Sequence, residues 1–182
     1  VKFVNLTTFL RLRQVTSHPS VINTDLSNLS LSQLIALEKQ NKSIKFDRLE
    51  ELLETLAESN EKAIIFSNFS RVVKLVEARF QKYNPLTIIG DIPSNERMRR
   101  AELFQNNPDN KIIVGTIGAM GTGITLTAAS HVIFIDQPWN KALEDQASDR
   151  AHRIGQKSTV FIHRLLCKDT IDPKVNQIVQ TK

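Results

Sequence analysis

Two arginines one helical turn apart are the residues of this sequence best suited to phosphate chemistry. They are Arg150 and Arg153, in the stretch Gln-Ala-Ser-Asp-Arg-Ala-His-Arg-Ile-Gly-Gln at residues 146–156. A guanidinium is planar, always charged and able to donate two parallel hydrogen bonds to phosphate oxygens. Aimed at a γ-phosphoryl group, it stabilises the charge that develops there during transfer. A lone Arg-x-x-Arg is more often an ordinary solvated helix face, so the interpretation depends on the residues around it.

The segment that carries these arginines is predicted to be one helix from about residue 141 to 153. Asn140 precedes it and can cap its first turn. Gln146, Arg150 and Arg153 fall at i, i+4 and i+7 and therefore share one polar stripe. An adjacent stripe is apolar and is predicted to pack on a sheet; it consists of Leu143, Ala147, Ala151 and Ile154.

A glycine-rich stretch offers a second place for an anion. Residues 115–126 read Gly-Thr-Ile-Gly-Ala-Met-Gly-Thr-Gly-Ile-Thr-Leu. Glycines allow a backbone to approach an anion closely. The stretch is neither a P-loop nor a G-x-G-x-x-G fingerprint, because no Gly-Lys-Thr follows and position 126 is leucine. The alternative is a tight turn with a purely structural role.

Two further polar segments follow predicted strands. Ser67 and Asn68 come after an apolar run, and their alternative role is to cap the next helix. Ser94 is predicted to cap a helix in which Arg97 and Arg100 fall at i, i+3. Free amides at the positive end of a helix, with an arginine nearby, bind phosphate well. The alternative here is a solvated basic face.

The elements that position these residues alternate between strands and helices. Apolar runs predict strands at 62–67, 86–89, 111–114, 132–135 and 159–166. Helical periodicity predicts helices at 5–16, 31–40, 46–56, 69–80, 94–104 and from 171 onward, with a loop at 20–30. In the first helix, Leu6, Phe9 and Leu10 are expected on one side and Arg11 and Arg13 on the other. The alternation predicts a parallel α/β sheet with helices on both faces and ligands at the carboxyl ends of the strands.

Residues 146–156 closely resemble motif VI of the Swi/Snf family of DNA-dependent ATPases, in helicase superfamily two. Residues 115–126 resemble the family's motif V, residues 67–70 its motif IV, and residues 136–140 its Asp-x-x-Trp-Asn segment. Three positions depart from the family pattern: Met120 replaces a glycine, Thr125 the usual asparagine, and Lys141 the proline after Asn140. The resemblance covers nearly the whole chain and is strongest over residues 62–166.

The resemblance implies a RecA-like lobe, a three-layer parallel sheet with helices on both faces, over residues 45–182. A short helical segment, residues 1–44, precedes it. Arg150 and Arg153 would be arginine fingers. The residues implied near the nucleotide are Gly121, Gly123, Gln146, Arg150 and Arg153. The residues implied along the DNA track are Ser67, Asn68, Ser94, Arg97, Arg100, Thr116 and Gly118.

The resemblance also implies the cofactors and partners. ATP and Mg²⁺ would be bound mainly by the N-terminal RecA-like lobe of the same protein, since this chain has no Gly-Lys-Ser/Thr and no Asp-Glu-x-His. The chain alone is therefore expected to be inactive. Double-stranded DNA is the implied partner. Two alternatives stay open: a strand-separating helicase of the same superfamily, against which the His-Arg-Ile-Gly-Gln ending argues, and a nucleic-acid-binding module without ATPase activity.

Composition is consistent with an intracellular protein. The 182 residues are 41% hydrophobic and 24% charged, with a formal net charge of +5, which favours an anionic partner and nucleic acid first. No secretion signal or membrane-length apolar run is present, so no membrane partner is expected.

The single cysteine, Cys167, is predicted to be a buried, inert thiol. With His152 and His163 it lacks metal-ligand spacing, so no metal site is predicted. Trp139 is expected to be a packing anchor, and the start on Val1 suggests a piece of a longer protein.

Overall fold

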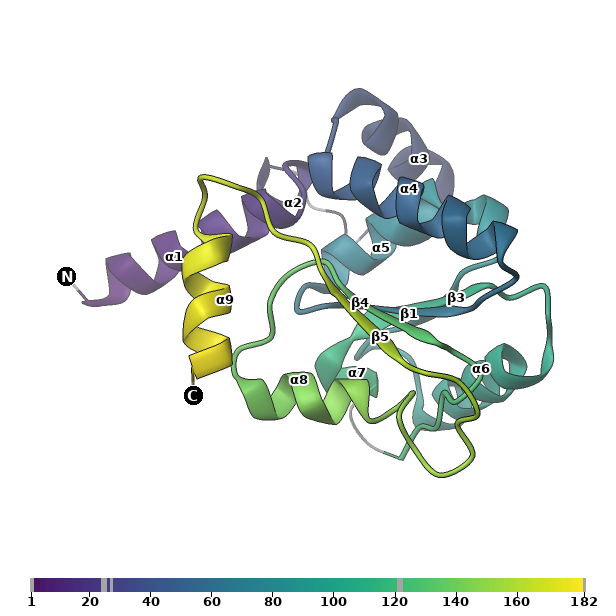
Figure 1. Ribbon diagram of the computed structural model, residues 1–182. Coiled ribbons are helices and arrows are strands. Elements are labelled where there is room, and N and C mark those ends of the chain that lie inside the picture. The colour runs from purple at the N-terminus through teal and green to yellow at the C-terminus, as the bar shows by residue number, and fades with distance from the viewer. Residues whose placement is uncertain (1, 24–25, 27, 121–122, 182) are drawn as a thin grey trace.

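A five-stranded parallel sheet lies at the centre of the computed structural model, which describes residues 2–23, 26, 28–120 and 123–181 (Figure 1). Its strands are β1 (Ala63–Ser67), β2 (Leu86–Ile88), β3 (Ile112–Thr116), β4 (His131–Phe134) and β5 (Phe161–Arg164). They lie in the order β2-β3-β1-β4-β5, and each pair of neighbours is parallel. All five coincide with predicted strands to within a few residues. Because every strand runs the same way, the loops after them emerge at one edge of the sheet.

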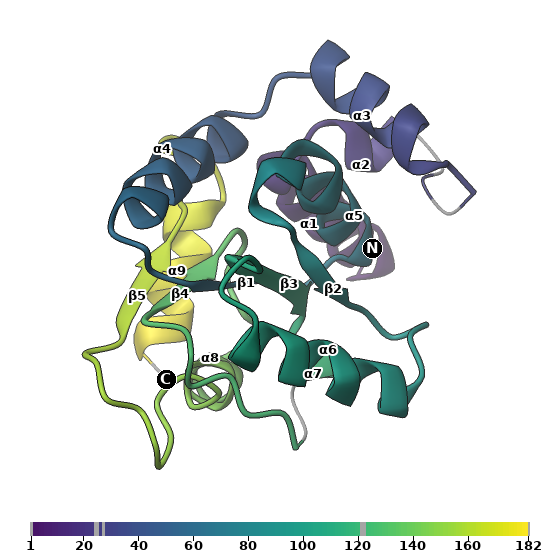
Figure 2. The same ribbon diagram turned by 90° about the vertical axis from the view of Figure 1, so that its right-hand side faces the viewer.

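Helices cover both faces, as the RecA-like prediction requires. On one face lie α4 (Ile44–Glu58) and α5 (Ser70–Arg79); on the other lie α6 (Ser94–Asn106), α7 (Ile117–Met120) and α8 (Lys141–Ser148) (Figure 2). Three further helices precede α4 in the chain, namely α1 (Lys2–Ser17), α2 (Ser20–Asn23) and α3 (Leu31–Gln40). The 3-10 turn η1 (Gln81–Tyr83) leads into β2, and α9 (Asp172–Thr181) follows β5. The loop predicted at 20–30 therefore begins with a short helix.

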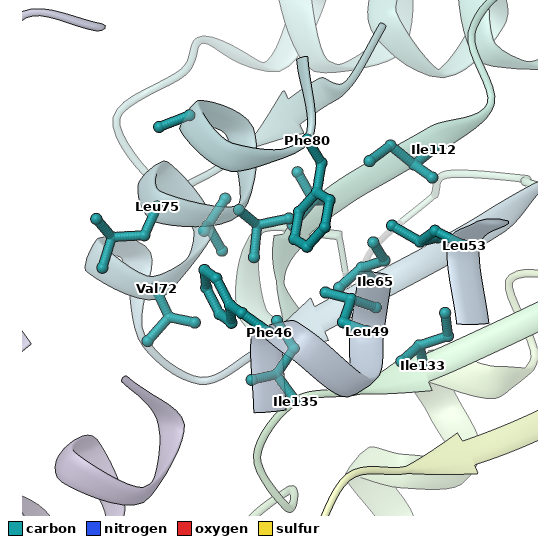
Figure 3. Packing of buried hydrophobic residues seen from close by; sticks show 14 of the residues in the cluster. Phe46, Leu49, Leu53, Ile65, Val72, Leu75, Phe80, Ile112, Ile133 and Ile135 are labelled. Carbon is teal, nitrogen blue, oxygen red and sulfur yellow. The ribbon is translucent and has the colours of Figure 1, made fainter. Parts of the chain in front are cut away.

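The face under α4 and α5 holds the larger of the two hydrophobic clusters in the described part of the chain. Phe46 and Leu49 of α4 pack with Phe80, which follows α5, over Ile65 of β1 and Ile133 of β4 (Figure 3). The clusters divide because successive strand residues point to opposite faces. Val21, Leu26 and Leu34 belong to this same cluster, so the helical segment packs directly on the lobe. The division at residue 44 stays a prediction.

The opposite face holds a smaller cluster that contains several alanines. It joins β-strand residues such as Phe66 and Phe134 to α6, α7, α8 and the loop after α7. Its alanines are Ala101, Ala119, Ala129, Ala147 and Ala151. This is the cluster on which the predicted nucleotide-binding elements rest.

A buried ion pair ties the two ends of the chain to the middle. Lys45 Nζ of α4 lies 2.7 Å from Asp172 Oδ2 at the start of α9, and it also donates to the Ile135 carbonyl at 2.7 Å. Asp172 accepts two further hydrogen bonds, from Thr16 Oγ1 of α1 and from the backbone amide of Cys167, both at 3.0 Å. Both charges are almost fully buried, and such a pair is tolerated because its remaining polar atoms are also bonded.

Two sequence predictions about side-chain burial are corrected. Arg13 was expected on the solvent side of α1 but is 2% exposed, because its guanidinium donates to the Gln137 carbonyl and lies 4.1 Å from the ring centroid of Trp139. Trp139 itself is half-exposed. Cys167 is half-buried rather than buried, and its burial raises the pKa of the thiol. None of the helices in the described residues is long and apolar enough to cross a membrane.

Candidate functional site

The helix that leads to the two arginines is shorter than predicted. Asn140 caps α8 as expected, with its Oδ1 accepting from the Leu143 amide at 2.9 Å. The helix ends at Ser148, however, and residues 149–155 form consecutive turns. The backbone carbonyl of Arg150 accepts a hydrogen bond from Leu126 N at 2.9 Å, which takes it out of any helical ladder. The prediction of one helix to residue 153 is therefore wrong.

Both arginines reach the end of the glycine-rich loop. Arg150 Nη1 donates to the Ile124 carbonyl at 3.3 Å, and its Nε donates to the Gln146 carbonyl at 3.3 Å. Arg153 Nη1 donates to Thr125 Oγ1 at 3.1 Å, and its side chain is exposed. The two arginines therefore contact the same loop, but turns and not the predicted helical stripe bring them there.

The predicted apolar stripe is right for three of its four members. Ala147 and Ala151 are buried in the alanine-containing cluster, and Leu143 packs against that cluster. Ile154 is fully exposed, because it lies in the turns and not on α8. Gly155, expected at a helix end, has a φ of +104° within these turns, a conformation that glycine adopts readily.

The last residue of the arginine stretch fixes the turns in place. Gln156 Nε2 donates to the carbonyls of Thr127, Ala129 and Ala151 at 3.1, 2.8 and 3.1 Å. Its Oε1 accepts from Ser158 N at 2.9 Å. One amide side chain thus joins the arginine-bearing turns to the loop that runs into β4.

The glycine-rich loop is shaped by a close approach at its start. A Cβ built on Gly115 would lie 2.3 Å from Met120 Sδ and 2.4 Å from the Ile88 carbonyl oxygen, so only glycine fits. Met120, which departs from the family pattern, is fully buried beside it. After Gly115 the backbone presents the half-buried Thr116 and the exposed Gly118. Gly123 is exposed with a φ of +73°, whereas the predicted nucleotide residue Gly121 lies outside the described residues.

Ser67 and Asn68 are engaged by Asp136 at the ends of neighbouring strands. Ser67 Oγ donates to one carboxylate oxygen of Asp136, and the backbone amide of Asn68 donates to the other at 2.9 Å. Asn68 Nδ2 also donates to the Gln137 carbonyl at 2.7 Å. Ser67 is fully buried and its hydroxyl is bonded to Asp136, so the implied place of Ser67 along the DNA track is corrected. Neither residue is the cap of α5, whose N-cap position is Phe69.

The basic residues of α6 already have partners within the chain. Arg97 donates to the carbonyls of Ile92 at 2.6 Å and Gly90 at 2.7 Å, and it reaches Ala119 O at 3.4 Å. Arg100 donates to Glu96 at 2.8 Å and to the Thr87 carbonyl at 2.7 Å. Ser94 is not the cap that the sequence predicted: it is the first helical residue, the N-cap is Pro93, and no side chain caps this end. Arg97 therefore brings the loop after β2 against α7, which follows β3.

The comparisons with known proteins agree with this geometry. The family model described as the helicase conserved C-terminal domain matches residues 44–155, which is more than half of the chain. The chain belongs to this family. Solved relatives place it within the Swi/Snf type. The Sulfolobus solfataricus SWI2/SNF2 ATPase core in complex with double-stranded DNA is 31% identical with a TM-score of 0.75; the match covers 97% of this chain and 35% of that one.

Curated sequences give the same assignment for this Swi/Snf C-terminal lobe. YwqA of Bacillus subtilis, assigned as an ATP-dependent helicase/translocase, is 32% identical over 94% of this chain and 18% of its own length. The human chromatin-remodeling ATPase INO80 is 36% identical over 76% of this chain and 9% of its own length. The chain thus spans less than one fifth of these relatives.

A buried carboxylate, which the sequence did not single out, anchors α8 of the Swi/Snf lobe. Glu144 has no exposed surface and accepts from Arg164 at 2.6 and 2.9 Å, from Lys141 at 2.7 Å and from Gln180 at 3.0 and 3.2 Å. Burial alone would raise its pKa, but the hydrogen bonds from Arg164, Lys141 and Gln180 outweigh it and lower the pKa to about 2. This carboxylate joins α8 to β5 and α9.

Sequence reasoning assigned no structural role to three residues that hold the site together: Asp136, Glu144 and Gln156. Asp136 had a usable signal, because an acid directly after a buried strand must find donors nearby. Gln156 was recognised only as part of a motif. The described residues contain no group of three or more histidine, cysteine or acidic side chains placed to hold a metal ion.

Proposed function

We propose that this Swi/Snf lobe is the C-terminal half of an ATP-dependent motor that moves along double-stranded DNA. Arg150 and Arg153 act as its arginine fingers. The observation that carries the proposal is the exposed guanidinium of Arg153, which is held by the Thr125 hydroxyl and joins no ion pair among the described residues. A cation held by a neutral group keeps its charge and most of its donors for phosphate oxygens.

The nucleotide fits between this lobe and the N-terminal RecA-like lobe of the same protein. That N-terminal lobe makes most of the contacts to ATP and Mg²⁺. When bound, ATP supplies the γ-phosphoryl group that is transferred to water. Arg153 stabilises the negative charge that develops on that group. Arg150 is half-buried and holds the carbonyl of Ile124, so it also shapes the loop. Gln146 and Gly123 are both exposed; the Gln146 carbonyl accepts from Arg150 Nε, and Gly123 directly precedes Ile124.

The DNA track lies on the loops after β2 and β3. The first amides of α6, from Ser94 onward, have no side-chain cap, and such amides bind phosphate oxygens. Thr116, at the end of β3, offers a hydroxyl, and Gly118, in α7, has open space beside its backbone; Arg97 bonds the Ala119 carbonyl of α7 and so holds this turn against the start of α6. Arg100 adds the donors that Glu96 and the Thr87 carbonyl leave unused, whereas both Nδ2 hydrogens of Asn68 are already taken by Asp136 and the Gln137 carbonyl. Contacts of this kind read the DNA backbone and not its sequence.

The test uses the complete protein that carries this chain, since the isolated lobe is expected to hydrolyse ATP negligibly. Arg153→Ala should lower the kcat of DNA-stimulated hydrolysis by about 10³-fold or more, with little change in DNA affinity or melting temperature. A variant that melts normally and turns over near the wild-type rate would refute the finger assignment. Release of single strands from a short duplex during turnover would favour a strand-separating helicase over a translocase.

A further inference from the structure

Thr125 is placed to control the direction of the Arg153 side chain. Its Oγ1 accepts from Arg153 Nη1 at 3.1 Å across a gap of 28 positions in the sequence. An exposed arginine otherwise samples many rotamers, and the side chain loses this conformational entropy when it binds a ligand. One tether at Nη1 restricts the side chain while leaving the other donors of the guanidinium available.

The threonine is itself held rigidly on both sides. Its neighbours Ile124 and Leu126 are 2% and 0% exposed and belong to the alanine-containing cluster. Their backbones are also bonded to Arg150, through the Ile124 carbonyl at 3.3 Å and the Leu126 amide at 2.9 Å. A β-branched side chain on such a backbone has few χ1 choices. The hydroxyl of Thr125 is therefore a fixed acceptor.

We propose that Thr125 is a positioning residue for the reaction: its hydroxyl fixes the guanidinium of Arg153 so that its free donors meet the γ-phosphoryl group. The proposal rests on the proposed function, because it assumes that Arg153 works at that group. Thr125 does not itself touch the nucleotide. Its effect should appear in kcat, since a small misplacement of a catalytic group slows the chemical step far more than it weakens ground-state binding.

The experiment compares three single substitutions in the complete protein. Thr125→Val keeps the shape and removes the acceptor, whereas Thr125→Ser keeps the acceptor and removes a methyl group. Thr127→Val is the matched control, because Thr127 lies two residues further along the same loop and its hydroxyl accepts from Gln105 Nε2 at 3.0 Å and not from an arginine; its backbone carbonyl, which accepts from Gln156, is unchanged by the substitution. Each variant is measured for DNA-stimulated kcat, KM for ATP, affinity for ADP and melting temperature.

We expect Thr125→Val to lower kcat about tenfold, with KM, ADP affinity and melting temperature unchanged. Thr125→Ser should stay within about twofold of the wild type, as should Thr127→Val. Equal rates for Thr125→Val and Thr127→Val would overturn the proposal, and so would a Thr125→Ser protein as slow as Thr125→Val. A loss of kcat that comes with a lower melting temperature or weaker ADP binding would also overturn it, because it would indicate a purely structural role.

The double variant Arg153→Ala/Thr125→Val distinguishes the positioning role of Thr125 from the proposed arginine-finger role of Arg153. If Thr125 acts through Arg153, the double variant should be no slower than Arg153→Ala. Additive losses would show that Thr125 acts independently of Arg153. If Arg153→Ala turns over normally, the proposed function itself fails; if Arg153→Ala is slow and Thr125→Val is normal, only the positioning role fails.

Discussion

Arg150 Nη1 lies 3.3 Å from the carbonyl oxygen of Ile124, so this arginine holds the loop beside which it is proposed to work. The two finger residues should consequently differ in their effect on stability. Arg150→Ala should lower the free energy of unfolding by about 1 kcal/mol, because it leaves a partly buried carbonyl without its donor. Arg153→Ala should change it by no more than about 0.5 kcal/mol, because the side chain is exposed. Chemical denaturation of both variants measures the difference.

Lys157→Ala is the control for these two variants, since Lys157 is an exposed cation directly after the same segment. It should leave both stability and turnover unchanged. Equal stability losses for Arg150→Ala and Arg153→Ala would contradict the division of roles between the two arginines.

Gln156→Glu tests the amide that fixes the arginine turns. The new carboxylate would face the three carbonyl oxygens to which Gln156 Nε2 now donates. We expect the free energy of unfolding to fall by about 2 kcal/mol, because a carboxylate oxygen cannot donate to these carbonyl oxygens and would leave them without a partner. Gln177→Glu makes the same chemical change at an exposed position of α9 and should be neutral. The idea is wrong if the two variants melt at the same temperature.

Gly115→Ala tests the close approach at the start of the glycine-rich loop. The added methyl group would overlap Met120 Sδ and the backbone oxygen of Ile88, and the latter cannot move without shifting β2. We expect a destabilisation of about 2 kcal/mol from this overpacking. Gly118→Ala serves as the comparison, because a methyl group added there would meet no atom within 4 Å. Similar unfolding curves for the two proteins would argue against the packing account.

The buried carboxylate of Glu144 should make the lobe sensitive to acid. Its pKa falls from 4.5 to about 2 on folding, so its contribution is complete above pH 4.5 and is lost as the pH drops toward 2. A shift of that size corresponds to about 3 kcal/mol at neutral pH. Glu144→Gln should therefore be less stable at pH 7 and should show a shallower decline between about pH 5 and pH 2.

Glu51→Gln is the matched control for the pH experiment, because Glu51 belongs to an exposed ion pair with Arg48. Exposed pairs contribute little to stability. An acid decline that is as steep in Glu144→Gln as in the wild type would show that other groups dominate the acid response.

Local patterns in the sequence are sufficient to predict the sheet and most helices. Strand residues such as Ile64 and Phe66 form short apolar runs because both faces of a parallel strand are buried. Asn140 is identifiable as a cap because a capping side chain acts on its own first turn. These features depend on neighbours in the chain, so one sequence carries enough information about them.

Features that depend on distant residues are the ones that could not be predicted. The predicted helix runs past Ser148 because helical periodicity continues to residue 153, and nothing local shows that Leu126 N will bond the carbonyl of Arg150. The burial of Arg13 is invisible to local patterns because its partners, Gln137 and Trp139, lie far along the chain. The site prediction named the arginines but not the Gln156 and Thr125 contacts that hold them and their turns.

The two faces of the sheet are covered by hydrophobic clusters of different size. The cluster under α7 and α8 is the smaller of the two, and these helices have four and eight residues, whereas α4 and α5 have fifteen and ten residues and cover the larger cluster. Segments with less buried apolar surface unfold locally at a lower free-energy cost. Backbone amides of α7 and α8 should therefore exchange with deuterium through sub-global openings, while those of α4 and α5 exchange only when the whole lobe unfolds. We therefore expect the half of the molecule that carries Arg150 and Arg153 to open locally before the rest of the lobe unfolds.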